Sequence, residues 1–179
     1  MMANEHTQLL TDGTIRLRAL EPTDLDMVEQ WENDTRLWTV TDTQAPYSRQ
    51  MIWQYLKTYN GDIYASHCLR LVITLAQSGQ AVGLLDFEHF SAFNNRCEIG
   101  LLVAGQFVGC GYGHRAVAIA MRYAAEHLGL RQAYVVVRTD NESCLRVFED
   151  NGFEHSGLLK QWIKRGKQYH DALILQRLL

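Results

Sequence analysis

A glycine-rich segment, residues 109–113, separates two parts of the chain that follow different hydrophobic patterns. Before it, apolar and polar residues alternate in three stretches bounded by turn residues, which predicts an antiparallel meander. These predicted strands lie at 69–75, 81–90 and 96–103. After the glycines, apolar residues recur at helical spacing as far as Leu128, and a continuous apolar run follows at 134–137. Such a run suits a strand buried on both faces. Strand, helix and strand in this order form a parallel pair through a right-handed crossover, so we expect a mixed α/β fold.

The other elements fit into one domain. A chain of 179 residues has the length of a single domain, and no linker or internal repeat interrupts 1–179. Alternation predicts a first strand at 15–19, and helical spacing predicts helices near 25–31 and 48–59. Asn141 is a good N-cap and Gly152 a good C-terminal residue for a later helix. Two more strands surround a turn at 164–167.

Composition excludes several function classes. The 17 basic and 20 acidic side chains give a net charge of −3, which argues against nucleic acid as a partner. No apolar run of about 18 residues exists, and the N-terminus does not resemble a secretory signal, so we expect no membrane association and a cytoplasmic protein. The 4 cysteines and 7 histidines match no metal-binding spacing, so we expect reduced thiols and no metal.

The glycines at 109–113 are of a kind that binds phosphate. Glycine lets a backbone approach a ligand closely, and the start of a helix offers free N–H groups and a positive dipole end. Together these features favour a phosphate cradle. A dinucleotide-binding loop requires a third glycine at another spacing, and a Walker loop requires Gly-Lys-Ser/Thr, which is absent. A tight glycine turn without any ligand is the remaining alternative.

The order of these motifs resembles the GNAT superfamily of N-acetyltransferases. The family loop Q/R-x-x-G-x-G/A corresponds here to Val108 through Gly113. The family pattern N-x-x-[AS]-x-x-[VIL]-[YF] corresponds to Asn141 through Phe148, and Gly152-Phe153 follows it. The resemblance extends over about 14–175 and looks closest to the spermidine/diamine and Rim-type (ribosomal-protein N-terminal) branch. It implies a central, mostly antiparallel twisted sheet with a splayed parallel strand pair and flanking helices.

The resemblance also implies acetyl-CoA as cosubstrate, with no metal. The pyrophosphate would lie on the loop, and the pantetheine arm would pair with the preceding strand like an additional strand. Asn141 would lie near that arm, and Phe148 belongs to the same motif. The residues implied for cofactor binding are Leu101, Leu102, Val103, Val108, Gly109, Cys110, Gly111, Tyr112, Gly113, His114, Asn141 and Phe148.

Two positions depart from the family pattern. Val108 replaces the usual Gln or Arg, so one side-chain contact to the cofactor is lost, although the backbone cradle does not depend on it. Phe148 stands where many relatives have a tyrosine that protonates the leaving thiolate, which a phenyl ring cannot do. Cys144 and Tyr112 are candidate donors in its place. Some relatives have a glutamate at the offset of Glu98, which makes it the candidate general base; an ordinary surface acid is the alternative.

The acceptor is less clearly indicated. Residues 21–34 hold six acids and no Lys or Arg, and the first helices of GNAT enzymes border the acceptor cleft. An acidic rim attracts cationic amines, but a solvated helix face explains the same acids. Glu32, Trp38 and Asp86 are the candidate substrate-binding residues. We expect a small-molecule primary amine, most plausibly a diamine or polyamine. A protein N-terminus, an aminoglycoside and a non-catalytic acyl-CoA-binding role are alternatives, and a homodimer or larger homo-oligomer is possible.

Overall fold

The computed structural model describes residues 9–38 and 43–179. It divides the chain into two compact units. The smaller is Ala19–Gly61, and the larger consists of the segments on either side of it. We describe each unit by itself, and the single domain over 1–179 stays a prediction.

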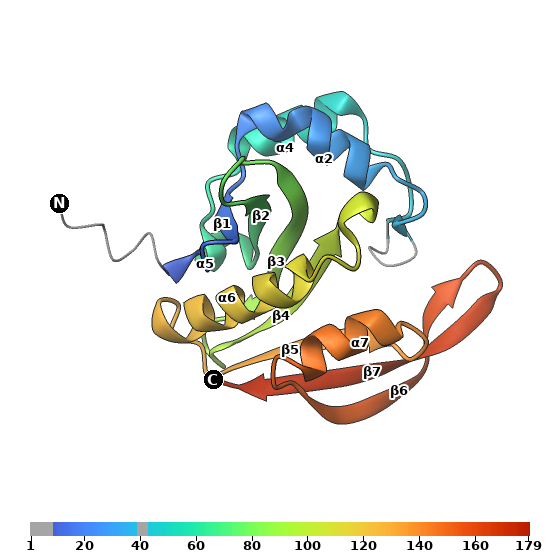
Figure 1. Ribbon diagram of the computed structural model, residues 1–179. Coiled ribbons are helices and arrows are strands. Elements are labelled where there is room, and N and C mark those ends of the chain that lie inside the picture. The colour runs from blue at the N-terminus through green and yellow to red at the C-terminus, as the bar shows by residue number, and fades with distance from the viewer. Residues whose placement is uncertain (1–8, 39–42) are drawn as a thin grey trace. The chain divides into compact units, whose positions relative to one another are not determined.

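A seven-stranded sheet forms the centre of the larger unit (Figure 1). Its strand order is β1-β2-β3-β4-β5-β7-β6, and the pairs β2–β3, β3–β4, β5–β7 and β7–β6 are antiparallel. Only β4 and β5 are recorded as a parallel pair within 9–38 and 43–179. The strands are β1 (Ile15–Ala19), β2 (Leu69–Leu75), β3 (Ala81–Ser91), β4 (Arg96–Val103), β5 (Gln132–Arg138), β6 (Glu154–Arg165) and β7 (Gln168–Leu178). The predicted fold class is therefore confirmed.

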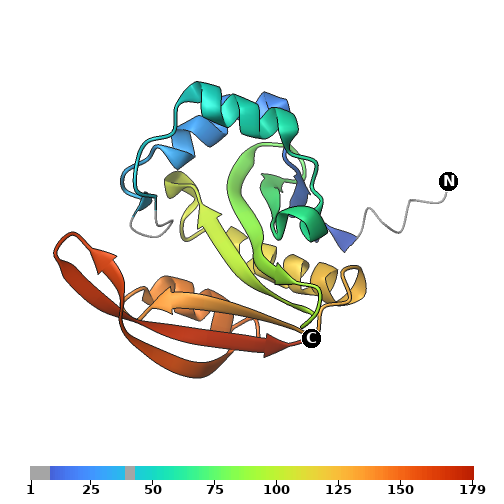
Figure 2. The same ribbon diagram turned by 180° about the vertical axis from the view of Figure 1, so that it is seen from behind.

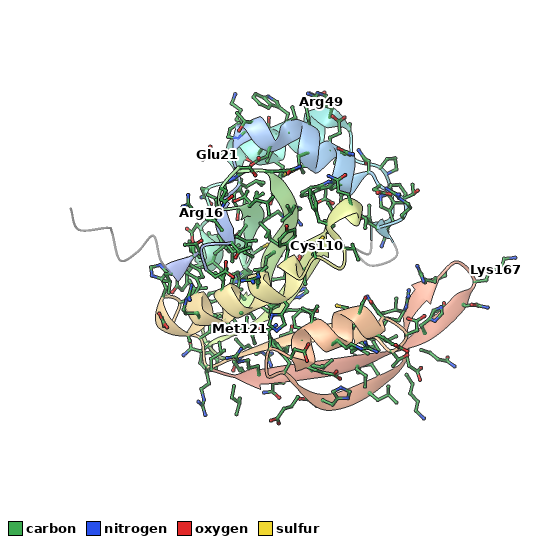
Figure 3. The ribbon with its side chains drawn as sticks, viewed as in Figure 1. Arg16, Glu21, Arg49, Cys110, Met121 and Lys167 are labelled. Atoms are coloured by element: carbon green, nitrogen blue, oxygen red, sulfur yellow. The ribbon has the colours of Figure 1, made fainter. Side chains whose placement is uncertain are left out.

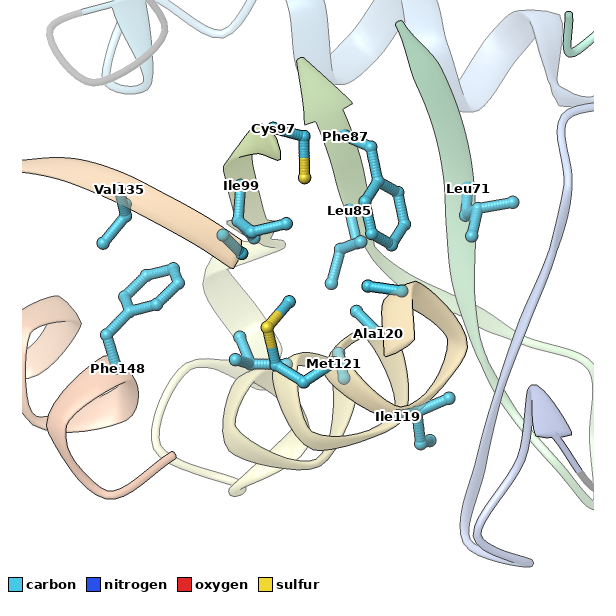
Figure 4. Packing of buried hydrophobic residues seen from close by; sticks show 14 of the residues in the cluster. Leu71, Leu85, Phe87, Cys97, Ile99, Ile119, Ala120, Met121, Val135 and Phe148 are labelled. Atoms are coloured by element: carbon cyan, nitrogen blue, oxygen red, sulfur yellow. The ribbon is translucent and has the colours of Figure 1, made fainter. Parts of the chain in front are cut away.

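Two helices cover one face of this sheet (Figures 1 and 2). They are α6 (Tyr112–Glu126) and α7 (Glu142–Glu149). Alternate side chains of the central strands point toward them, and the helices contribute their apolar faces to the same core (Figure 4). Neither helix is long and apolar enough to cross a membrane, and the same holds for every other helix in the described part of the chain. The core residues drawn and labelled include Leu85, Phe87, Cys97, Ile99, Ala120, Met121 and Phe148.

Strand β5 is buried on one face rather than both. Val135 and Val137 belong to the core, whereas Tyr134 and Val136 are partly exposed. The expectation from the apolar run 134–137 was wrong because only one face of this strand is covered by the core helices. The run of β-branched residues nevertheless marks the strand correctly.

Strands β4 and β5 separate after a short parallel ladder. Only three residue pairs join them, the last of which is Glu98 with Tyr134. Beyond it, β4 remains paired with β3 as far as Val103, and β5 remains paired with β7 as far as Arg138. Figure 2 shows the two strands diverging from this point. We call the gap between Ile99–Val103 and Val135–Arg138 the fork. The splayed parallel pair implied by the family resemblance is present.

Further short helices occur in both units. In the larger unit, a helix that the sequence did not predict, α5 (Ile63–Ser66), begins after Asp62, whose carboxylate accepts the amides of Tyr64 and Ala65. The smaller unit holds the 3-10 turn η1 (Pro22–Asp24), α2 (Leu25–Glu32) and α4 (Arg49–Thr58). Ser48 caps α4 by accepting the amide of Met51, which confirms the expected start of that helix.

Candidate functional site

The glycine loop contains two residues with a left-handed backbone conformation. Gly109 has φ +85° and Gly111 has φ +79°, and a Cβ atom at either position would meet nothing within 4 Å. Glycine is needed here for the backbone conformation, since L residues rarely adopt a positive φ. Gly111 is the N-cap of α6 and offers no side chain to cap it. Cys110, between the two glycines, is exposed at the start of the helix (Figure 3).

Several amides of this loop have no acceptor in the part of the chain that the structure describes. The amide of Cys110 donates to the Phe107 carbonyl at 3.2 Å. By contrast, no acceptor within 9–38 and 43–179 is recorded for the amides at 109 and 111–114. Three of these amides belong to the first three residues of α6, a 15-residue helix whose first turn contains no acid. Free donors at the positive end of a helix dipole form a site for an anion such as a phosphate.

Gly113 holds the start of α6 against β4. It is buried, and an added Cβ would lie 3.3 Å from Leu101 Cδ2 and 3.3 Å from Val103 Cγ2. A larger residue would therefore push the helix away from the strand. This close packing brings the free amides to the open end of the fork, beside the last residues of β4. Leu101, Leu102 and Val103 are partly exposed there.

The first turn of α7 lies in the same unit and uses Asn141 as its N-cap. The Oδ1 atom of Asn141 accepts the amide of Cys144 at 3.3 Å and the hydroxyl of Ser143 at 3.1 Å. Burial raises the pKa of the Cys144 thiol to about 11, so this thiol is protonated at neutral pH. Phe148 is only 1% exposed and packs edge-to-face against Phe153, with the ring centres 5.0 Å apart. The phenyl ring that replaces the usual tyrosine therefore belongs to the core.

Asn151 ties α7 to the first turn of α6. Its Nδ2 atom donates to the carbonyl of His114 at 3.2 Å and to the carbonyl of Val147 at 2.7 Å. The side chain is almost completely buried, so these bonds are shielded from water. The start of α6 and the end of α7 are thus held together by one amide group.

Three carboxylates gather on the sheet face away from α6 and α7. Glu88 on β3 is directly opposite Glu98 on β4, and Asp86 is opposite Gly100. Because Gly100 has no side chain, it leaves room for these acids. A Cβ atom added there would crowd them, at 3.2 Å from Asp86 Cβ and 3.5 Å from Glu88 Oε2. We call Asp86, Glu88 and Glu98 the carboxylate trio. Because Glu98 is in the last β4–β5 pair, the trio lies beside the closed end of the fork.

The three acids differ in their partners. Asp86 accepts two hydrogen bonds from Arg70 of β2, at 2.9 and 2.8 Å. Glu98 is 3.0 Å from His89 Nδ1 and also accepts a hydrogen bond from Tyr134. No hydrogen-bond partner is recorded for Glu88 among the residues that the structure describes. Burial raises the pKa of Glu88, and the charge of Asp86 raises it further. An acid with a raised pKa and no partner is a site of unfavourable electrostatics, as is common where a protein binds cations or moves protons.

Neutralising two members of the trio should change stability in opposite directions. Because the pKa of Glu88 is raised in the folded state, its ionised form destabilises the protein above that pKa, and this penalty disappears below the unfolded-state value. Glu88→Gln should therefore raise Tm at about pH 8 and leave it unchanged at about pH 4. Asp86→Asn removes the charge partner of largely buried Arg70 and should lower the free energy of unfolding by about 3 kcal/mol. Thermal unfolding of both variants at the two pH values tests this, and equal signs at pH 8 would contradict it.

The structure brings together two of the site residues that the sequence predicted on the sheet, Asp86 and Glu98. Glu98 and Asp86 belong to the trio, and Glu98 lies on the face opposite Cys97 and Ile99, as alternation predicts. Glu88 was missed, although its position two residues after Asp86 on a strand places both on one face. Arg70 and His89 were also missed, because neither the pairing of β2 with β3 nor the local backbone of His89 can be read from residue types.

The acids of the smaller unit are mostly engaged locally. Arg49 binds both Asp26 and Glu29, and Arg36 binds Asp34. The predicted acceptor residues Glu32 and Trp38 contact each other, because Trp38 Nε1 donates to the Glu32 carbonyl at 2.8 Å. Their role in acceptor binding stays a prediction. Within 9–38 and 43–179, no group of three or more Asp, Glu, His or Cys side chains is arranged so that it could hold a metal ion.

Comparison with protein families identifies the fold and its chemistry. The family model for the acetyltransferase (GNAT) domain matches residues 14–154. The chain belongs to the GNAT family. This GNAT protein is an N-acetyltransferase, and relatives with that activity align along most of its length. The spermidine N(1)-acetyltransferase of Vibrio cholerae serotype O1 is 24% identical over 161 residues, covering 90% of this chain and 91% of the relative. The putative ribosomal N-acetyltransferase YdaF of Bacillus subtilis is 26% identical over 99 residues, covering 55% and 54%.

Solved structures agree on the GNAT fold. Spermidine N-acetyltransferase from Vibrio cholerae, in complex with CoA and spermine, has a TM-score of 0.82 at 23% identity, covering 93% of this chain and 96% of that one. RimL, a ribosomal L7/L12 alpha-N-protein acetyltransferase in complex with coenzyme A, has a TM-score of 0.81 at 20% identity, covering 95% and 96%. At these identities the two structures establish the fold alone.

Proposed function

We propose that this acetyltransferase moves the acetyl group of acetyl-CoA to a primary amine of a diamine or polyamine. The observation that carries the proposal is the carboxylate trio at the closed end of the fork, Asp86, Glu88 and Glu98. Among the residues that the structure describes, one guanidinium, that of Arg70, is bonded to the trio, and it neutralises Asp86. The remaining negative charge favours an acceptor that carries more than one ammonium group.

The residues of the loop and the fork fit acetyl-CoA. The free amides at 109 and 111–114 suit its pyrophosphate, and the left-handed glycines keep that surface clear of side chains. Within the described ranges, the edge of β4 from Ile99 to Val103 has no strand partner on the β5 side. Backbone groups on such an edge can pair with the amides of a pantetheine arm. The other predicted contacts, from Val108, Asn141 and Phe148, belong to the same proposal.

The chemistry needs a base before it needs an acid. An alkyl ammonium has a pKa of about 10, so it must lose a proton before its nitrogen attacks the thioester carbon. We assign this proton to Glu98. The C–N bond then forms, the carbonyl oxygen takes up negative charge near the β4 amides, and the C–S bond breaks as that charge returns. Glu88, whose pKa is raised, would hold the second ammonium group of the acceptor, with Asp86 beside it on β3.

The leaving thiolate does not require a strong acid. A thiol has a pKa of about 8.5, so its thiolate leaves more easily than an alkoxide would. Cys144 remains a candidate donor, but a thiol whose pKa is about 11 gives up its proton less readily than the CoA thiol does. Tyr112 is the other candidate. We therefore propose that the thiolate departs largely without a proton donor, and that Phe148 can for this reason stand where many relatives have a tyrosine.

A second candidate function is acetylation of a protein N-terminus. The similarity to the putative ribosomal N-acetyltransferase YdaF favours it, although that similarity covers only 55% of this chain. An α-amino group has a pKa of about 8 and needs less help from a base. A peptide also requires an open groove rather than a compact acidic site. An aminoglycoside acceptor fits the trio as well as a polyamine does.

The release of CoA thiol from acetyl-CoA by the purified protein tests these alternatives. We expect turnover with putrescine, spermidine and spermine. n-Butylamine is the matched control for putrescine, since it keeps the chain length and lacks the second ammonium group, and its kcat/KM should be at least about tenfold lower. Turnover with basic N-terminal peptides or an aminoglycoside alone would contradict the polyamine assignment. Equal kcat/KM for butylamine and putrescine would remove the role given to the trio.

A further inference from the structure

A bulge in β3 turns one histidine toward the carboxylate trio. Glu88 pairs with Glu98 and Ser91 pairs with Arg96, so two residues of β3, His89 and Phe90, lie opposite Cys97 alone. Strict alternation would place His89 on the core face together with Phe87. Instead Phe90 is buried, and His89 has a left-handed backbone with φ +48°. Bulges of this kind re-aim side chains and are common beside active sites.

The result is a contact between His89 and Glu98. His89 Nδ1 is 3.0 Å from Glu98 Oε2, and the His89 side chain is 72% exposed. On the other side, Tyr134 of β5 donates to the same glutamate. A left-handed conformation costs a residue with a Cβ atom roughly 1–2 kcal/mol. Such strain at a polar, solvent-exposed contact points to a role for the imidazole beyond packing.

The proposed reaction leaves one proton to be disposed of in each turnover. The acceptor begins as R–NH3+ and ends as an amide that keeps one of its three hydrogens. When the CoA thiolate takes up another, one proton remains and must reach water. Glu98 is the proposed first acceptor of this proton and is itself mostly buried, with a side chain 20% exposed. A route from its carboxyl group to solvent is therefore required.

We propose that His89 carries this proton from Glu98 to water, an inference that rests on the proposed function of Glu98 as base. In the resting site His89 Nδ1–H donates to the ionised Glu98. When Glu98 takes a proton from the ammonium group, the ring moves its own proton from Nδ1 to Nε2 by exchange with water, accepts the Glu98 proton at Nδ1 and loses the Nε2 proton to solvent. The exposed ring exchanges its nitrogen protons with water and returns to its starting tautomer. His89 acts through Glu98 and is a positioning residue. The charged groups around it are Glu98, the preceding Glu88 and, beyond these, Asp86 with Arg70.

His89→Asn is the variant that tests the relay. Asparagine tolerates the left-handed backbone and can still donate to Glu98, but it cannot carry a proton. We expect kcat to fall by about 10- to 100-fold with an unchanged KM for acetyl-CoA. The matched control is His155→Asn, because His155 contacts Glu149 at 2.7 Å and is 50% exposed on β6, away from the trio. The control should keep the wild-type kcat.

Chemical rescue separates a relay from a structural role. In His89→Gly the positive φ is relaxed, and added imidazole should restore kcat in proportion to the concentration of its free base. The wild-type rate should not depend on imidazole or buffer concentration. Full activity of His89→Asn, or a loss that imidazole does not restore, would overturn the relay even though the acetyltransferase activity stands.

A spectroscopic test checks the pairing without turnover. The nitrogen chemical shifts of the His89 ring report its tautomer, which the Glu98 carboxylate should bias toward Nδ1–H. Glu98→Ala should abolish this bias, while His155 in the same spectrum stays unchanged. An unaltered His89 tautomer would overturn the relay. A wild-type protein that acetylates no amine would overturn the proposed function and the relay together.

Discussion

Replacing Gly111 by glutamate is expected to abolish acetyl-CoA binding while the protein remains folded. The new carboxylate would lie at the N-terminus of α6, where the free amides of 111–114 lie. It would compete for these donors and repel the pyrophosphate, since both groups seek the same positive end of the helix dipole. We expect the Kd for CoA to rise at least about 100-fold, or about 2.7 kcal/mol. Titration calorimetry with CoA measures this directly.

Gly79→Glu is the matched control for this variant. Gly79 has φ +73°, a Cβ there would also meet nothing within 4 Å, and it lies in the turn between β2 and β3. Both substitutions impose the same left-handed strain of roughly 1–2 kcal/mol, so the two variants should show similar losses in Tm. Only the loop variant should lose CoA affinity. Unchanged binding in Gly111→Glu would remove the cofactor from the glycine loop.

Glu98→Gln should lower kcat by about 10²- to 10⁴-fold, the range expected when a general base is lost. The amide keeps the shape of the side chain and can still accept hydrogen bonds from Tyr134 and His89, so we expect the fold and the KM for acetyl-CoA to be retained. Steady-state kinetics with spermidine as the acceptor, at saturating acetyl-CoA, measure the effect.

Glu149→Gln provides the comparison for this loss. Glu149 at the end of α7 also contacts an exposed histidine, His155, but lies outside the trio. Its neutral variant should turn over at the wild-type rate. If Glu98→Gln did so too, the proton would have to go elsewhere, and Glu88 with its raised pKa would be the next candidate.

Local patterns predicted the elements that depend on neighbouring residues. The ranges of β2 and β4 agree with the alternation of their side chains, and Ser48 and Asn141 cap helices because a short polar side chain before an apolar helical stretch has few other uses. The glycine loop was predictable for the same reason, since the strand before it and the helix after it are both encoded nearby.

The parts that depend on distant pairing were not predictable from residue types. The bulge at His89 arises from the register between β3 and β4, and nothing in the segment 88–91 distinguishes it from an uninterrupted strand. Likewise the β4–β5 ladder ends after Glu98 because the two strands diverge in space, although apolar residues continue in both. The trio could be predicted in part, because Asp86 and Glu88 share a face by alternation, whereas the bond of Arg70 to Asp86 needs the pairing of β2 with β3.

The fork has a consequence for how long the protein persists. A sheet held across its middle by three residue pairs is least cohesive there. A molecule that pairs with β4 like a strand would provide hydrogen bonds that the two halves of the sheet lack at this point. Its binding free energy would add to the stability of the folded chain, by about 2.7 kcal/mol when its concentration is 100 times its Kd. When the supply of acyl donor falls, the same chain would open and be degraded more readily, so the abundance of the enzyme would follow the supply of its own substrate.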